Sequence, residues 1–313
     1  MQTWESLDAR PVPDWYDDAK LGLLITWGPY AVPAWAPASR DFADLVAQYG
    51  LEHALAHDPR AEWYANGMQL SASPTHEHHR SAWGRLTRYE SFGRTFRQGL
   101  KEWDAEPWAE AAAGCGARYV VFSAKHHDGF LLWPSRRKNP RRRGWQTTHD
   151  VVGGLAEAVR GRGMRFGLYY SAGLDWTFGG LPIKNLKDFV DAVPRGSAYA
   201  SYVDAHMREL ISRYQPSILW NDVCSPSEQD LLSLFSSYFE EVPDGVVNDR
   251  FGQAEPGSRG NILRRALEAL RGLFPSRDRA SPRGAVSPEP RHMGFRTIEE
   301  GPLPENEEGK WEK

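Results

Sequence analysis

Five short apolar runs, separated by segments of helical character, constrain the fold of this 313-residue chain more than any other feature. The runs lie at residues 21–28, 117–127, 165–173, 217–222 and 245–249. They are continuously hydrophobic rather than alternating, a pattern typical of parallel strands that helices cover. Strands and helices in this alternating order predict an α/β fold with right-handed crossovers.

Capping residues and prolines mark the helices expected between these strands. Asp104 and Asp150 are good N-caps for helices over residues 104–116 and 150–163. Two further helices, over residues 199–216 and 227–243, each end at a proline.

Polar residues stand where the predicted strands end. Four strand ends carry such groups: Lys125, His126, His127 and Asp128; then Ser171; then Asn221 and Asp222; then Asn248, Asp249 and Arg250. In a (β/α)-barrel the carboxyl ends of the strands converge on one mouth, where active sites sit. An open doubly wound sheet is the alternative, but no GxGxxG follows a strand to support it. We therefore predict a TIM-barrel-like domain with its site at that mouth.

Composition narrows the class of protein. Hydrophobic residues make up 41 % and charged residues 25 %, which is ordinary for a soluble globular protein. The net charge of -3 disfavours a nucleic-acid partner. The start of the chain has no signal-peptide pattern, and no run reaches the roughly 18 apolar residues of a membrane span. We expect a cytoplasmic protein with no membrane partner.

Asp222 raises a question, because it directly follows an apolar strand. It is a candidate for three roles: cap of a helix beginning near Ser227, partner of an ion pair with Arg250, or catalytic group. If Asp222 is catalytic, one reaction that a strand-end carboxylate can serve is glycoside hydrolysis, which requires a second carboxyl group. Glu62, Asp175 and Glu312 are candidates for it, and composition and spacing do not choose among them.

Other polar or basic segments are interpreted structurally. We predict an exposed loop for residues 75–80 and a solvated loop for the basic residues 135–144. Adjacent histidines on a strand have poor spacing for zinc, so hydrogen bonding to a polar ligand is a better functional interpretation of His126 and His127 than a metal site. On this motif alone, a pair of hydrogen-bonded core histidines is the favoured alternative. Residues 253–294 are rich in Pro, Gly and Arg and are expected to form an insertion whose short helix packs on the barrel. A membrane-surface or partner-docking helix is the alternative there.

Several blocks of the sequence resemble a known family when they are taken together and in order. They are WYDDAKLGLLITWGPYAVPAWAP, EWYANGM, ARYVVFSAKHHDGFLLWPS, RFGLYYSAGLDW, ILWND, VVNDRFG and GFRTIEEGPLPENEEGKWE. In this order they resemble the α-L-fucosidases of glycoside hydrolase family 29. The resemblance implies a (β/α)-barrel-like catalytic domain, release of α-linked L-fucose with retention through a covalent fucosyl-aspartate, and no metal or other cofactor.

The resemblance also implies roles for particular residues. The nucleophile would be Asp222 and the general acid/base Glu312. Its substrate, a fucosylated oligosaccharide or glycoside, would meet the family's sugar-binding positions, which fall on Glu62, Trp63, His126, His127, Tyr169, Trp220 and Arg250. Where the family has a histidine that holds a fucose hydroxyl, this chain has Thr26. That change raises the alternative of a related glycosidase for another deoxy-sugar or for galactose.

A second departure concerns the end of the chain, one residue after Glu312. We expect residues 1–313 to be one incomplete barrel domain that lacks the family's last strands and its C-terminal β-sandwich. Open strand edges would favour association into homo-oligomers. The alternative function is that of an inactive, truncated family member or a weak glycan-binding remnant.

Overall fold

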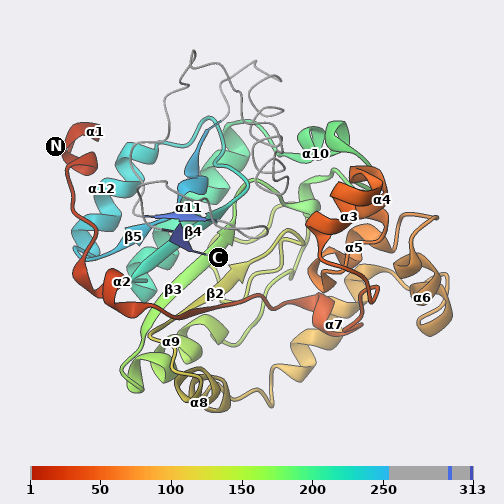
Figure 1. Ribbon diagram of the computed structural model, residues 1–313, viewed down its shortest axis with the longest axis horizontal. Coiled ribbons are helices and arrows are strands. Elements are labelled where there is room, and N and C mark those ends of the chain that lie inside the picture. Colours follow the sequence, from red (N-terminus) through yellow and green to blue (C-terminus); the bar gives the residue numbers. More distant parts are fainter. Residues whose placement is uncertain (1, 254–294, 298–310, 313) are drawn as a thin grey trace.

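A twisted parallel sheet organises the molecule in the computed structural model, which describes residues 2–253, 295–297 and 311–312 (Figure 1). For residues 296–297 and 311–312 only the backbone is described. The sheet has five strands in the order β1-β2-β3-β4-β5, and every neighbouring pair is parallel. The strands are β1 (Gly22–Ile25), β2 (Tyr119–Lys125), β3 (Arg165–Ser171), β4 (Ile218–Asp222) and β5 (Val246–Val247).

Sequential neighbours in a parallel sheet are the arrangement of a (β/α)-barrel, so the predicted α/β, TIM-barrel-like class is confirmed. All five predicted strands form, although β1 and β5 are shorter than their apolar runs. Central strands β2 and β4 are buried along their whole length, which explains why they read as continuous rather than alternating hydrophobic runs.

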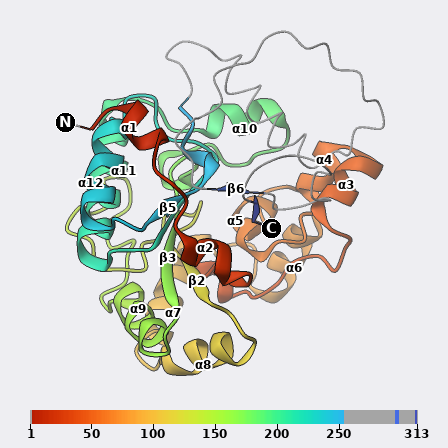
Figure 2. The same ribbon diagram turned by 60° about the vertical axis from the view of Figure 1, so that its left-hand side comes forward.

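Helices between consecutive strands cover the outside of the sheet (Figures 1 and 2). They are α8 (Glu106–Gly114), α9 (Val151–Gly161), α11 (Ser197–Tyr214) and α12 (Leu231–Glu241). Asp150 caps α9 as predicted, because its side chain accepts a hydrogen bond from the Gly153 amide. The α8 helix begins later than predicted, with Ala105 as its N-cap.

The remaining helices lie before β1 or in the long connections between strands. They are α1 (Trp4–Asp8), α2 (Asp14–Ala19), α3 (Phe42–Tyr49), α4 (Leu51–Ala56), α5 (Tyr64–Gly67), α6 (Pro74–Ala82), α7 (Tyr89–Gly99) and α10 (Leu186–Ala192), with short 3₁₀ turns η1 (Pro29–Ala31), η2 (Ala61–Trp63), η3 (Trp176–Phe178) and η4 (Asp249–Phe251). Helices α3 to α7 lie together to the right of the sheet in Figure 1.

The prediction of an exposed loop over residues 75–80 is wrong. These residues lie within α6, which Ser73 caps and Pro74 begins. His79 is buried there, 3.1 Å from the Tyr64 hydroxyl and 2.9 Å from the Thr87 carbonyl. The basic segment 135–144 forms a connection without regular structure, as expected, although Ser135 and Asn139 within it are buried.

After Gln253 the described chain resumes at Phe295, beside the sheet. The Phe295 amide donates to the Val247 carbonyl at 3.4 Å, and Phe295 forms a parallel bridge with Asn248. Strand β6 (Arg296–Thr297) follows and pairs in parallel with β7 (Trp311–Glu312). The predicted insertion, apart from Gln253 at its start, lies outside the described residues.

Two hydrophobic clusters pack on opposite faces of the sheet. The larger joins the outward-facing strand residues to the helices. The smaller fills the inner face and is rich in aromatic rings: Tyr16, Ala19, Tyr119, Val121, Tyr169, Ile218, Trp220, Val246 and Phe295. The ring centroids of Trp220 and Phe295 lie 5.6 Å apart in this inner core. Trp220 precedes Asp222 by two residues on β4, so the two side chains share one face of the sheet.

Candidate active site

Asp222 stands at the end of β4, and 9 % of its side chain is exposed. Its Oδ1 lies 3.1 Å from Arg250 Nη1 and accepts the Val223 amide at 2.8 Å. Its Oδ2 accepts a short hydrogen bond from the Tyr169 hydroxyl and lies 3.7 Å from His127 Nε2. Burial alone would raise the pKa of Asp222, but Arg250, His127 and Tyr169 hold it well below its usual range. The group is therefore an anion at neutral pH.

Of the three roles considered for Asp222, helix capping is wrong. Helix α12 begins at Leu231, and its cap is Asp230, whose carboxylate accepts the Ser233 amide at 3.0 Å. The ion pair with Arg250 is present. Val223 holds a φ of 68°, a left-handed conformation that is unfavourable for a β-branched residue. Strain of this kind concentrates at functional sites, so it directs attention to the end of β4.

A reciprocal pair of amides joins the ends of β4 and β5. Asn248 Oδ1 accepts the Asn221 amide at 2.9 Å, and Asn248 Nδ2 donates to the Asn221 carbonyl at 2.9 Å. The Asn221 side chain in turn donates to the Arg250 carbonyl at 2.9 Å. These bonds fix the backbone on both sides of the Asp222–Arg250 ion pair, so the pair is held from two adjoining strands.

Both adjacent histidines reach the site. They follow the last residue of β2, and a register shift between Ser123 and Lys125 precedes them. Beyond the strand end the two side chains need not alternate between faces, and their rings lie 4.2 Å apart. His126 stacks on Tyr169, and its Nδ1 is buried without a hydrogen-bond partner among the described residues.

Aromatic residues from distant loops complete the wall around His127. The Trp63 ring, at the end of η2, lies 5.6 Å from the His127 ring and 5.4 Å from Trp176. Trp176 also contacts His127, and its amide donates to the His127 carbonyl at 2.8 Å. Trp176 was not among the residues expected at the site, and the chain's 13 tryptophans are the one signal in the sequence that could have pointed to such a residue.

Tyr30 lies beside His126, and the sequence did not predict it as a site residue. Its ring meets the His126 ring edge-on at 5.8 Å. Burial raises the pKa of Tyr30 well above its ordinary value, the charges of Glu62 and Asp128 raise it further, and the hydroxyls of Thr26 and Ser123 partly offset this. Thr26 therefore lies next to Tyr30, whose ring also contacts His126.

Asp175 is excluded as the second catalytic carboxyl group. It is fully buried, with Oδ2 3.3 Å from Lys125 Nζ and Oδ1 accepting the Thr177 amide at 3.0 Å. A Cβ on Gly129 would lie 2.4 Å from Asp175 Oδ1, and Gly129 has a φ of +73°, so only glycine fits this turn. Asp175 thus supports the loop after the histidines. The backbone of Glu312 is in β7, and its side chain lies outside the described residues.

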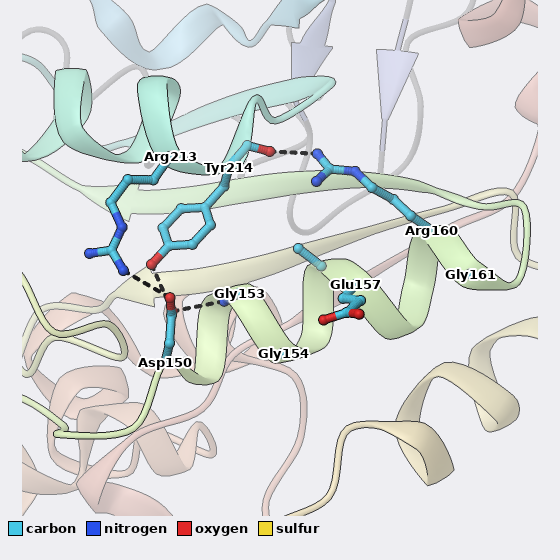
Figure 3. A pocket seen from close by; sticks show the side chains of 9 residues that line it. Asp150, Gly153, Gly154, Glu157, Arg160, Gly161, Arg213 and Tyr214 are labelled. Atoms are coloured by element: carbon cyan, nitrogen blue, oxygen red, sulfur yellow. Dashed lines mark hydrogen bonds and ion pairs between the residues drawn. The ribbon is translucent and has the colours of Figure 1, made fainter.

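Two hollows lie elsewhere on the described surface. One, of about 850 Å³, runs along the outer helices α9 and α11 (Figure 3). Its Asp150 accepts from Gly153, Arg213 and Tyr214, and its Arg160 donates to the Tyr214 carbonyl, so these polar groups satisfy one another. The other, of about 260 Å³, adjoins the histidine loop and is lined partly by Tyr89, Asp128 and Trp176. The strand-end cluster around Asp222 remains the site with the chemistry of an active centre.

Neither a metal site nor a membrane helix is found in the described part of the chain. No group of three or more histidine, cysteine, aspartate or glutamate side chains there has the geometry to hold a metal ion. Among the helices of the same residues, none combines the length and the apolar character needed to cross a bilayer.

Comparison with known proteins gives a consistent result. The family model described as Alpha-L-fucosidase matches residues 1–267. Tissue alpha-L-fucosidase of Homo sapiens is 31 % identical over 268 residues, covering 80 % of this chain and 49 % of the relative. The Thermotoga maritima alpha-fucosidase, solved in complex with fucose, is 39 % identical with a TM-score of 0.70, covering 80 % of this chain and 56 % of that chain. The chain thus spans about half the length of the curated relatives it matches.

Proposed function

Because the chain belongs to the α-L-fucosidases of glycoside hydrolase family 29, we propose that it is a retaining glycosidase that releases α-linked L-fucose, with Asp222 as the nucleophile. One observation carries this proposal. Asp222 is buried at a barrel strand end and is kept anionic by Arg250 and Tyr169. A desolvated, ionised carboxylate is the group that attacks an anomeric carbon in retaining enzymes.

The surroundings of Asp222 suit a deoxy-sugar. Trp63 and Trp220 offer apolar ring surface to the pyranose and its methyl group. His126, His127, Glu62 and Arg250 offer hydrogen-bonding groups to its hydroxyls and ring oxygen. The unpartnered Nδ1 of His126 is one group that a sugar hydroxyl would satisfy.

Glu312 is proposed as the general acid/base. Its backbone pairs with Thr297, which lies two residues after Phe295 and hence near Trp220 and the inner face of the sheet. This neighbourhood supports the proposal by proximity of the backbone alone. Retention would require the carboxyl groups of Asp222 and Glu312 to lie roughly 5–5.5 Å apart.

The reaction would proceed in two displacements. An Asp222 oxygen forms a bond to the anomeric carbon while the bond to the leaving oxygen breaks, and that oxygen takes the proton of Glu312. The ionised Glu312 then removes a proton from water, whose oxygen displaces Asp222 from the anomeric carbon. Fucose leaves with its original anomeric configuration, and both carboxyl groups return to their starting states. No cofactor takes part in these steps.

The test is hydrolysis of a panel of aryl glycosides by the whole chain: α-L-fucoside, α-L-rhamnoside, and α- and β-D-galactosides. Proton NMR of the first product formed reports its anomer. We expect turnover of the fucoside with α-L-fucose appearing first. Preference for a galactoside would overturn the assignment of the sugar, and β-L-fucose as the first product would overturn retention.

A further inference from the structure

Lys125 is a fully buried cation at the end of β2. Its Nζ donates to the carbonyls of Ser171 and Leu174, the second at 3.2 Å, and forms an ion pair with Asp175 Oδ2 at 3.3 Å. Burial lowers the pKa of Lys125, and the Asp175 carboxylate offsets part of that effect. A lysine is almost never buried without a compensating partner, and here its partners lie at the end of β3 and in the turn that follows it.

The hydroxyl of Ser171 stands between this turn and the active site. Its Oγ lies 2.7 Å from His127 Nδ1 and 3.0 Å from the Leu174 carbonyl. A hydroxyl has one proton to donate. Either Ser171 donates it to the Leu174 carbonyl and accepts an N–H from His127 Nδ1, or it donates it to Nδ1, so the tautomer of His127 decides between the two arrangements. The Leu174 carbonyl keeps a donor in either case, because it also accepts from Lys125.

Two charges of opposite sign lie on opposite sides of the His127 ring, and both favour the same tautomer of the neutral ring. On the Nε2 side the Asp222 carboxylate lies at 3.7 Å. On the Nδ1 side the Lys125 ammonium binds the same turn that Ser171 touches. Burial lowers the pKa of His127 to about 4 despite the opposing effect of Asp222, so the ring is neutral at pH 7 and carries a single N–H. Both charges favour that N–H at Nε2, facing the carboxylate, so Nδ1 is the acceptor and takes the proton of Ser171.

We propose that Ser171 and Lys125 are positioning residues that fix His127 as the Nε2–H tautomer. The geometry then makes His127 a hydrogen-bond donor toward the space beside Asp222. A substrate hydroxyl in that space accepts from Nε2–H and is left with its own proton facing the carboxylate. The statement about the substrate hydroxyl rests on the proposed function. The assignment of the His127 tautomer does not.

The direct test is the tautomer of His127 in the whole chain labelled with ¹⁵N-histidine. Long-range ¹H–¹⁵N correlation at pH 7 separates protonated from unprotonated ring nitrogens, and a His127→Gln variant assigns the signals. We expect a protonated Nε2 and an unprotonated Nδ1. A protonated Nδ1 in the wild type overturns the proposal, and this measurement requires only the assignment, not activity.

Variants then test the roles of the two positioning residues. Ser171→Ala removes the donor, and Lys125→Met frees the Leu174 carbonyl to compete for the Ser171 proton. We expect the His127 signals of both variants to move toward a mixture of tautomers, while Ser171→Thr, which keeps a hydroxyl, retains the wild-type pattern. Ser236→Ala is the matched control, because this serine donates to the Leu232 carbonyl within α12. An unchanged His127 pattern in Ser171→Ala would contradict the role of Ser171.

Activity measurements keep the two proposals separate. If the wild type has the Nε2–H tautomer and hydrolyses the fucoside, we expect Ser171→Ala to lower kcat/KM by roughly tenfold, since one oriented hydrogen bond is lost. An inactive wild type with the Nε2–H tautomer would contradict the proposed function alone. An active wild type with the Nδ1–H tautomer would contradict this inference alone.

Discussion

The Asp222 carboxylate and the Arg250 guanidinium form an ion pair at 3.1 Å across the ends of two neighbouring strands. Both side chains are largely shielded, with 9 % of Asp222 and 20 % of Arg250 exposed. Shielded pairs are screened little by solvent, so removing one partner leaves a charge that burial strongly disfavours. This relationship explains how a buried carboxylate stays ionised, as the proposed role of Asp222 as a nucleophile requires.

Arg250→Gln should raise the pKa of Asp222, because burial then acts with less opposition. In the wild type we expect no loss of kcat/KM from protonation of Asp222 above pH ~4, the ordinary value for a free aspartate. In Arg250→Gln, kcat/KM should begin to fall on the acid side of the profile (the acid limb) at a higher pH than in the wild type. The measurement is the pH profile of kcat/KM for an aryl α-L-fucoside.

Arg165→Gln is the matched control for this profile. Arg165 pairs with Asp244 at 2.6 Å, and 35 % of the Arg165 side chain and 50 % of the Asp244 side chain are exposed. Exposed pairs contribute little, so the profile should be that of the wild type. If the acid limb of Arg250→Gln coincides with that of Arg165→Gln, the role given to Arg250 is wrong.

Thr26→His should strengthen binding of a fucoside. Thr26 lies near Tyr30, which contacts His126, so an imidazole there would add a hydrogen-bonding group at the edge of the proposed sugar site. One such bond contributes about 1 kcal/mol, or roughly a fivefold lower KM. Thr26→Val separates the gain of the imidazole from the loss of the hydroxyl. A higher KM in Thr26→His than in Thr26→Val would show that this position does not face the sugar.

His206 should make the protein less stable in acid. It is fully buried, with Nδ1 2.9 Å from the Tyr170 hydroxyl and Nε2 2.6 Å from the Arg137 carbonyl, and burial lowers its pKa to about 3. Between that value and the ordinary value of about 6.5, the unfolded chain binds more protons than the folded one, so the free energy of unfolding falls as pH falls.

From pH 7 to pH 5 this residue alone should remove about 2 kcal/mol of that free energy. His206→Gln should therefore show a smaller drop than the wild type over the same range, whatever its stability at pH 7. Urea unfolding at the two pH values measures both drops. Equal drops in the two proteins would mean that His206 is not the residue responsible.

Two glycines on α7 should respond to alanine in opposite directions. A Cβ on Gly93 would lie 2.3 Å from the Trp145 ring, whose Nε1 donates to the Asp128 carbonyl at 2.8 Å. Gly93→Ala should lower the free energy of unfolding by about 1–3 kcal/mol through overpacking. A Cβ on Gly99 meets nothing within 4 Å, so Gly99→Ala should be neutral or stabilise by up to ~1 kcal/mol. Thermal melts of both variants measure the difference, and a destabilised Gly99→Ala would contradict this view of α7.

The sequence predicted the sheet well because its signal is local. Buried parallel strands such as β2 and β4 are apolar at every position, and caps such as Asp150 mark the helices between them. The same local reasoning missed α6, because its three histidines and its single arginine hid the Ser73–Pro74 start signal. It also left Asp222 as a candidate cap, although Asp230 lies closer to the start of α12.

The site was predictable only in part, because its remaining contacts are long-range. Trp220 and Asp222 share a strand, but Phe295 reaches Trp220 after an intervening stretch of more than seventy residues. Trp176 and Tyr30 join the histidines through loops whose paths no local pattern predicts. The bond between Ser171 and His127 likewise depends on how β2 and β3 end side by side.

The most direct test of the account is hydrolysis of an aryl α-L-fucoside by the 313-residue chain and by its Asp222→Ala variant, each checked for folding by far-UV circular dichroism. Asp244→Ala is the control, because it removes an exposed carboxylate from the sheet's opposite end. We predict turnover by the wild type and by Asp244→Ala, and none by a folded Asp222→Ala. Turnover retained in Asp222→Ala would contradict the assignment of the nucleophile, and silence from a folded wild type would contradict the proposed activity of this chain.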